Sequence, residues 1–183
     1  MKKETKKQLL IGAALVLELL FLLLYLNGRI DRLLDSDMSS EMILGQLLAR
    51  NNGILSDQWY YSTELRVLNT QLIYALFFRL SSNWHFVRMA STLVLWCVLI
   101  ASYGVLCRVM GCKKSFGVTA LLLAAPVSES YFRFVLAGVY YVPHLAIAFA
   151  ALALNEAYFK AKPDRKKFWL VVSVLLALVA GLG

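Results

Sequence analysis

The chain has 183 residues, of which 60% are hydrophobic and only 16% are charged. Soluble domains contain about half apolar and about a quarter charged residues, so this composition excludes an ordinary soluble domain and indicates that lipid is the main solvent. The formal net charge of +8 does not indicate a nucleic-acid partner, because the basic residues are clustered between long apolar runs. The three cysteines are an odd number along one apolar segment and its end, which favours neither a disulfide framework nor a metal cluster.

The first apolar run, residues 9–26, follows a basic N-terminus. At about 1.5 Å per residue it makes a helix of roughly 27 Å, close to the ~30 Å hydrocarbon thickness of a bilayer. The run is too long for the apolar region of a signal peptide, so we interpret it as an uncleaved first transmembrane helix. Glu18 lies in its middle, where it would be either an interhelical hydrogen-bonding group or part of a proton or ion relay.

Residues 27–83 form a long polar and aromatic interval that we expect to be an outer loop. Within it, residues 38–50 have the apolar spacing of a short helix, and Asn-Asn-Gly follows as a stop signal. A second helical pattern covers residues 64–80, but it begins with too many polar residues to span easily. We therefore expect one or two helices that lie in the outer interface of the membrane.

Further spans are predicted at residues 84–107, 115–130, 139–159 and 168–183. Pro126 and Pro143 are expected to kink their helices, and a tight turn is expected around Ser128 to Arg133. The predicted fold class is all-α: a polytopic α-helical membrane protein with about five transmembrane helices and the interfacial helices of the first outer loop. We expect residues 1–183 to form a single transmembrane domain, the N-terminal portion of a longer protein, because the last apolar run ends without a polar flank.

The distribution of basic residues predicts which side each connection faces. All lysines fall in the N-terminus, in the connection near residue 113 or in the connection near residue 163, whereas the predicted outer segments contain arginine alone. Short cytoplasmic loops carry the excess of lysine and arginine, so the N-terminus is expected in the cytoplasm and residues 27–83 outside it. A bacterial plasma (inner) membrane is the expected location.

The outer loop carries two carboxylates in the sequence Asp35-Ser36-Asp37. Two carboxylates at this spacing can share a hard divalent cation, or one of them can accept a proton while the other binds a cation. The alternative is structural: Asp37 is well placed as the N-cap of the helix predicted at residues 38–50.

Several cationic residues accompany these acids on the predicted outer side. Arginine binds phosphate through two parallel hydrogen bonds, so Arg66, Arg79 and Arg88 are candidates for contact with a phosphate group, and His85 is a further candidate. Anchoring in the membrane interface is the alternative role for each of them.

The order of these features resembles the N-terminal part of the GT-C integral membrane glycosyltransferases: a first span, then Asp35-Ser36-Asp37 shortly after it, interfacial helices and further spans with short loops. The resemblance implies an enzyme that transfers a sugar from a polyprenyl-phosphate-linked donor to an acceptor on the extracytoplasmic face. Asp35 and Asp37 would then be catalytic residues or ligands of a divalent metal such as Mg²⁺ or Mn²⁺. Glu129 would correspond to an acidic residue in a later outer loop. The implied partners are membrane lipids and the lipid-linked sugar.

Two other classes of function fit the sequence. A transporter or flippase of a lipid or small solute would use acidic and histidine residues within or at the ends of helices, such as Glu18, His144 and Glu156. A non-catalytic membrane assembly subunit would use none of these groups chemically.

Overall fold

The computed structural model describes residues 3–61 and 69–181. In these two ranges the regular structure is entirely helical and no residue lies in a strand, which confirms the predicted all-α class for the described part of the chain. The elements are α1 (Lys3–Asn27), the 3-10 helix η1 (Ile30–Leu33), α2 (Ser36–Asn51), α3 (Thr70–Phe78), α4 (Trp84–Met110), α5 (Lys113–Ala124), α6 (Glu129–Tyr131), the π-helix η2 (Phe132–Ala137), α7 (Val142–Lys160) and α8 (Pro163–Gly181).

Three described helices are long and apolar enough to cross a membrane: α4, α7 and the part of α1 from Lys6 to Asn27. The number rises to four if α5 and the α6–η2 segment, which meet at a bend of 90°, are counted as one broken span. α8 begins with Pro-Asp-Arg-Lys-Lys, and because of these charges it is not among the helices apolar enough to cross a membrane. The structure therefore agrees with a polytopic helical membrane protein of three or four spans, and the fifth span at residues 168–183 stays a prediction.

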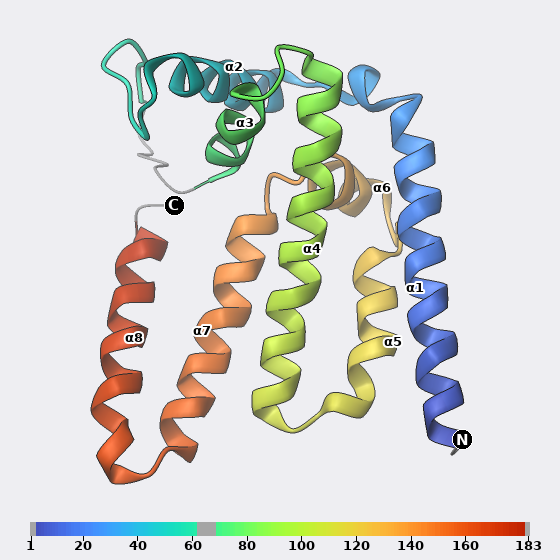
Figure 1. Cartoon of the computed structure of the whole chain (residues 1–183), viewed down its shortest axis with the longest axis vertical. Helices are drawn as coiled ribbons and strands as arrows, with labels where there is room; N and C mark the ends of the chain where they lie inside the picture. The colour runs from blue at the N-terminus through green and yellow to red at the C-terminus, as the bar shows by residue number, and fades with distance from the viewer. Residues whose placement is uncertain (1–2, 62–68, 182–183) are drawn as a thin grey trace.

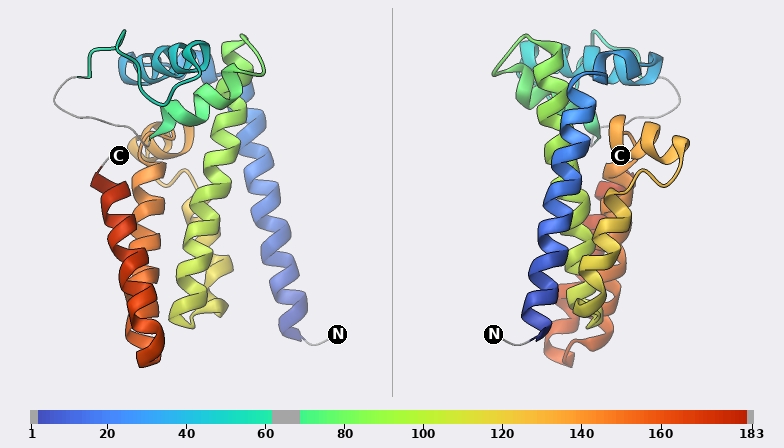
Figure 2. Two further views of the ribbon diagram at one scale, coloured as in Figure 1. Left: turned by 60° about the vertical axis from the view of Figure 1, so that its left-hand side comes forward. Right: turned by 90° about the vertical axis from the view of Figure 1, so that its right-hand side faces the viewer.

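The long helices stand side by side in the order α8, α7, α4, α5 and α1 (Figure 1). α4 packs against α7, α5 and α3, while α7 also packs against α8 and α1 packs against α5. η1, α2 and α3 lie across one end of these helices and are called the outer layer here. The α6–η2 segment lies below this layer (Figure 2).

The opposite end of the molecule holds the N-terminus, the α4–α5 connection and the α7–α8 connection (Figure 1). Every lysine of the described ranges belongs to these segments, so we call it the lysine end. The arginines of the outer layer and of the start of α4 lie at the other end: Arg29, Arg32, Arg50, Arg79 and Arg88. Arg108 and Arg165 lie at the lysine end, as predicted, so the fold gathers every described lysine at one end while arginines occur at both.

The main core surrounds the upper half of α4. Leu95, Trp96 and Leu99 are buried there against α1 and the α6–η2 segment. The Trp96 indole Nε1 donates a 2.9 Å hydrogen bond to the Leu136 carbonyl in the π-helix. The Leu136 carbonyl lies in irregular backbone and needs a donor from the protein, because lipid has none to offer.

The kink predicted at Pro126 is present as a break: α5 ends at Ala124, and the chain bends by 90° before α6. The span predicted at residues 115–130 stays a prediction, because α5 and the α6–η2 segment form a span only if the bent pair is counted as one. Pro126 lies in this break, where its missing N–H cannot continue the helix. The Tyr131 hydroxyl donates to the Leu123 carbonyl at 2.5 Å, so the last turn of α5 keeps a partner. The predicted tight turn at Ser128 to Arg133 is wrong, since Glu129 to Ala137 are helical.

Pro143 does not kink its helix. It lies in the first turn of α7, where a proline removes no intrahelical hydrogen bond, so the chain uses it to begin the helix. The preceding Val139 has a φ of +52° and no exposed surface. A positive φ is unusual for a β-branched residue, which marks the junction between η2 and α7 as a strained site.

The outer layer is held together by a close contact between α2 and α3. The helix predicted at residues 38–50 is confirmed as α2, and α3 corresponds to the later part of the pattern at residues 64–80, of which residues 64–68 lie outside the described ranges. A Cβ atom on Gly45 would lie 2.7 Å from the Tyr74 Cβ and 3.0 Å from the Gln71 carbonyl oxygen. Only a glycine allows the two helices to approach this closely.

We expect Gly45→Ala to destabilise the outer layer by about 1–3 kcal/mol, because the added methyl group meets the backbone of α3. The measurement is the unfolding temperature of the protein in detergent. The matched control is Gly12→Ala in α1, where an added Cβ meets no atom within 4 Å. An equal unfolding temperature for both variants would contradict the close contact.

Candidate functional site

The acidic turn, Asp35-Ser36-Asp37, begins α2. Asp35 is the N-cap residue, and its Oδ1 accepts the Met38 N–H at 2.9 Å. The expectation that Asp37 is the N-cap is therefore wrong: α2 begins at Ser36, two residues earlier than the predicted helix, and Asp37 lies exposed in its first turn. The turn thus has one carboxylate engaged by the backbone and one directed to solvent.

Arg88 connects this turn to the spanning helices. It is 2% exposed, and its Nη1 donates to the Ile30 carbonyl at the start of η1. Its Nη2 donates to the Leu33 carbonyl at 3.4 Å and contacts the Met38 Sδ at 3.0 Å. Because its terminal nitrogens serve the backbone and a buried side chain, this geometry favours a structural role for Arg88 over the predicted contact with a phosphate.

Met38 also ties the outer layer to the broken segment. A Cβ atom on Gly138, just after η2, would lie 2.5 Å from the Met38 Cε. Met38 is 3% exposed, so its side chain is enclosed between α4 and the η2–α7 junction. Met38, whose N–H donates to the Asp35 carboxylate, is therefore packed against both α4 and the η2–α7 junction.

His85, a predicted substrate-binding residue, bridges α4 to the end of α1. Its Nδ1 lies 2.9 Å from the Asp31 Oδ2, and its Nε2 lies 3.1 Å from the Asn27 Oδ1. The imidazole is part of the surface, and both of its nitrogens have partners within the protein. His85 thus holds η1 against α4 from the exposed side, as Arg88 does from the buried side.

Glu41 has a role that sequence reasoning missed. Its Oε2 accepts the Thr70 hydroxyl at 2.9 Å and the Gln71 N–H at 3.2 Å, so it caps α3 from the neighbouring helix. Burial raises the pKa of the nearby Tyr74 hydroxyl; Arg88 lowers this pKa, and the charges of Glu41 and Asp35 raise it. The Tyr74 hydroxyl therefore stays neutral at neutral pH.

The remaining predicted residues do not gather around the acidic turn. Arg79 is exposed at the end of α3, and Glu129 is exposed at the start of α6. Arg66 lies outside the described residues. The arginines closest to the turn along the chain are Arg29, whose guanidinium lies 4.2 Å from the centre of the Tyr25 ring, and the exposed Arg32. Their place between α1 and the two aspartates was the signal that could have identified them.

The two aspartates supply only part of a metal site. In residues 3–61 and 69–181, no three His, Cys, Asp or Glu side chains form a group that could hold a metal ion. One oxygen of Asp35 is already used by the cap. Magnesium is commonly held by one or two carboxylates with water and substrate phosphate, so a cation at Asp35 and Asp37 would need water and a bound phosphate as further ligands, and this site stays a prediction. The cation would then neutralise phosphate charge.

A buried polar face on α4 lies below the Arg88 clamp. Arg88, Ser91 and Thr92 share one side of the helix by their spacing, and each is at most 2% exposed. The Arg88 Nε, the Ser91 Oγ and the Thr92 Oγ1 have no hydrogen-bond partner among the described residues. Buried polar atoms of folded proteins are usually paired with protein groups or with ordered water.

Comparisons with protein-family models, with curated proteins and with solved structures found no match to this chain. The geometry of the site itself consists of an exposed Asp37 carboxylate in a turn that Asp35 caps, with the exposed Arg29 and Arg32 preceding it in the chain.

We expect Asp35→Ala to destabilise the protein by about 1 kcal/mol through loss of the N-cap, and Asp37→Ala to cost a few tenths of a kcal/mol through the helix dipole. Asp35→Asn keeps an acceptor oxygen and is the control. Unfolding temperatures in detergent measure all three. A larger loss of stability in Asp37→Ala than in Asp35→Ala would show that Asp37, and not Asp35, is the N-cap residue of α2.

We expect Arg88→Met to lower the stability by about 2–4 kcal/mol, because the Ile30 and Leu33 carbonyls lose a buried donor. The matched control is Arg79→Met, an exposed change that should stay within about 0.5 kcal/mol of the parent. Equal unfolding temperatures for the two variants would show that Arg88 is not a clamp.

Proposed function

We propose that the chain is a membrane glycosyltransferase that transfers a sugar from a polyprenyl-phosphate-linked donor to an acceptor on the extracytoplasmic face. The observation that supports it is the acidic turn: Asp35 and the Arg88 clamp hold its backbone, while the Asp37 carboxylate stays exposed. A fixed turn with a free carboxylate suits a general base, which must be positioned before the reaction begins.

Asp37 is the proposed base. Its carboxylate accepts the proton of the acceptor hydroxyl while that oxygen forms a bond to the anomeric carbon of the sugar. The bond between this carbon and the phosphate oxygen breaks, and its electron pair leaves with the polyprenyl phosphate. Asp35 positions the turn through its hydrogen bond to Met38.

Exposed arginines are the proposed partners of the departing phosphate. Arg29 and Arg32 are exposed and directly precede the acidic turn in the chain, whereas Arg79 does not lie with the turn and is not included. Arginine suits a phosphate at headgroup depth because its planar fork makes paired, charge-assisted hydrogen bonds. Arg88 is not included, since its terminal nitrogens are used inside the fold.

The proposed orientation places the lysine end in the cytoplasm and the outer layer outside a bacterial plasma membrane. The positive-inside rule supports it, because every connection at the lysine end is short and basic. α8 is the proposed fifth span, with its basic first turns at the cytoplasmic surface.

The experiment replaces the chromosomal copy of the gene with an Asp37→Asn version. We expect loss of one envelope glycan and accumulation of its polyprenyl-linked precursor, measured by mass spectrometry at unchanged protein level, because the amide cannot accept the proton. The control is Asp57→Asn, which changes an exposed aspartate of the outer loop away from the turn. Wild-type glycans in the Asp37→Asn strain would refute the assignment.

A transporter or flippase is the second candidate. The broken α5/α6–η2 pair and the buried polar face at Arg88, Ser91 and Thr92 favour it, because transporters place interrupted helices and buried polar groups at their binding sites. In that case Glu18→Gln, a change within α1, should impair function more than Asp37→Asn. Loss of function in neither variant would instead favour an assembly subunit.

A further inference from the structure

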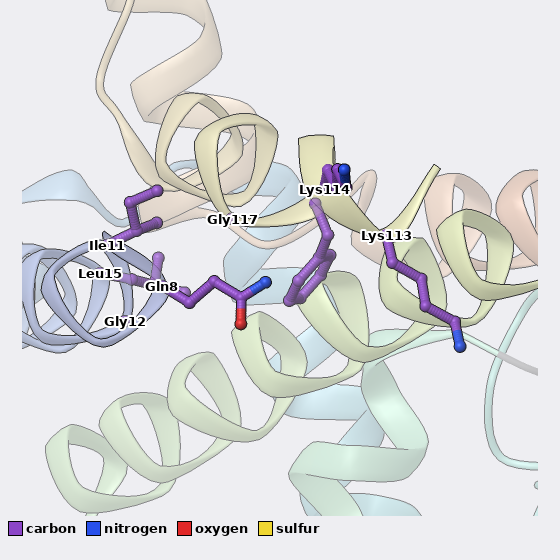
Figure 3. Close-up of a pocket in the computed structure, with 8 residues that line it drawn as sticks. Gln8, Ile11, Gly12, Leu15, Lys113, Lys114 and Gly117 are labelled. Atoms are coloured by element: carbon purple, nitrogen blue, oxygen red, sulfur yellow. The ribbon is translucent and has the colours of Figure 1, made fainter. Parts of the chain in front are cut away.

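A cavity of about 320 Å³ opens between α1 and α5 at the lysine end. α1 contributes Gln8, Ile11, Gly12 and Leu15, and α5 contributes Lys113, Lys114, Phe116 and Gly117 (Figure 3). The proposed transferase site lies in the outer layer, at the opposite end of the bundle (Figure 1). The cavity is therefore separate from the proposed transferase site.

Two contacts of α5 shape the cavity. A Cβ atom on Gly117 would lie 2.6 Å from the Ile11 Cγ2, so α1 and α5 touch at this point. Phe116 is held on the other side by Tyr103 of α4, with ring centres 6.1 Å apart and the planes 23° from parallel. The wall of the cavity is thus packed in place from two neighbouring helices.

The lining changes from cationic to apolar across the cavity. Lys113 and Lys114 form the first turn of α5, whose N-cap residue, Cys112, provides no side-chain hydrogen bond. The positive end of the helix dipole adds to the charge of the two lysines. Ile11 and Leu15 continue the lining toward the middle of α1, within the segment apolar enough to span.

We propose that this cavity binds the headgroup of an anionic phospholipid of the cytoplasmic leaflet, with the start of an acyl chain along Ile11 and Leu15. Basic pockets between spanning helices at the cytoplasmic surface bind anionic headgroups, and the apolar wall selects a lipid over a free phosphate ion. This site does not rest on the proposed glycosyl transfer, because it uses neither the outer layer nor the acidic turn.

The test uses the full chain purified in detergent and titrated with phosphatidylglycerol, followed by native mass spectrometry of the bound lipid and by the unfolding temperature. Changing Lys113 and Lys114 together to glutamine should weaken binding roughly 30-fold, since each lysine near an anionic lipid contributes about a factor of five. The control changes Lys166 and Lys167 to glutamine. This control removes the same charge at the same end of the molecule, outside the cavity lining. Its affinity for phosphatidylglycerol should stay within about threefold of the parent affinity, because salt screens distant charges.

A second variant tests the cavity without changing its charge. Gly12→Phe places a ring in the open space at Gly12, where an added Cβ meets no atom within 4 Å, and should block the lipid while the lysines remain. Two further ligands are tested separately: phosphatidylcholine with the same acyl chains, and inorganic phosphate. Each should raise the unfolding temperature by far less than phosphatidylglycerol does.

Three results would overturn the proposal. Equal binding of phosphatidylcholine would remove the charge selectivity, and an equal effect of inorganic phosphate would replace the lipid with a free anion. Unchanged binding in the Lys113/Lys114 or the Gly12→Phe variant, at an unchanged unfolding temperature without lipid, would place the lipid elsewhere on the protein.

Discussion

The outer layer depends on the hydrogen bonds that the buried Arg88 guanidinium donates to backbone carbonyls. A cation removed from water is costly unless its donors are paired, and the partners here are the carbonyls of η1 and the Met38 sulfur in the first turn of α2. The clamp thereby joins three elements, because α4 provides the cation while η1 and α2 provide its acceptors. Asp35 and its cap lie between these acceptors, so the position of the acidic turn follows from the clamp.

The same requirement recurs wherever a helix is interrupted in apolar surroundings. Trp96 donates to the Leu136 carbonyl in the π-helix, and Tyr131 donates to the Leu123 carbonyl at the end of α5. Lipid supplies no hydrogen-bond donors, so each carbonyl released by irregular backbone needs one from the protein. The break after α5 persists because these donors exist. The contact of Met38 with Gly138 then connects the broken segment to the outer layer.

The two ends of the molecule differ in chemistry in a way that matches the two proposals. The outer end carries arginines and a rigid acidic turn, and the lysine end carries a basic cavity with an apolar wall. A lipid-linked sugar and an anionic phospholipid both join a phosphate to a hydrocarbon chain. Each would need a cationic group beside an apolar surface at headgroup depth.

The sequence by itself determined the helical class, the first span, the long central helix, α2 and the sidedness of the lysines. Those features depend on hydropathy and charge along the chain, which are local properties. α4 begins at the predicted residue and ends three residues later than predicted, whereas α1 ends one residue after the predicted limit and begins six residues before it. Local pattern was also sufficient to identify the acidic turn as a feature of the outer loop.

Only the tertiary structure decided which residue of the turn caps α2, which arginine is buried and where the second half of the bundle breaks. Asp35 and Asp37 satisfy the same local capping pattern, and the choice between them depends on where η1 ends. Arg79 and Arg88 look alike in sequence, but only Arg88 meets carbonyls that lie 58 and 55 positions away. Glu41 likewise caps a helix that begins 29 positions later. Such partners are brought together by packing, so no spacing rule that spans a few residues can predict them.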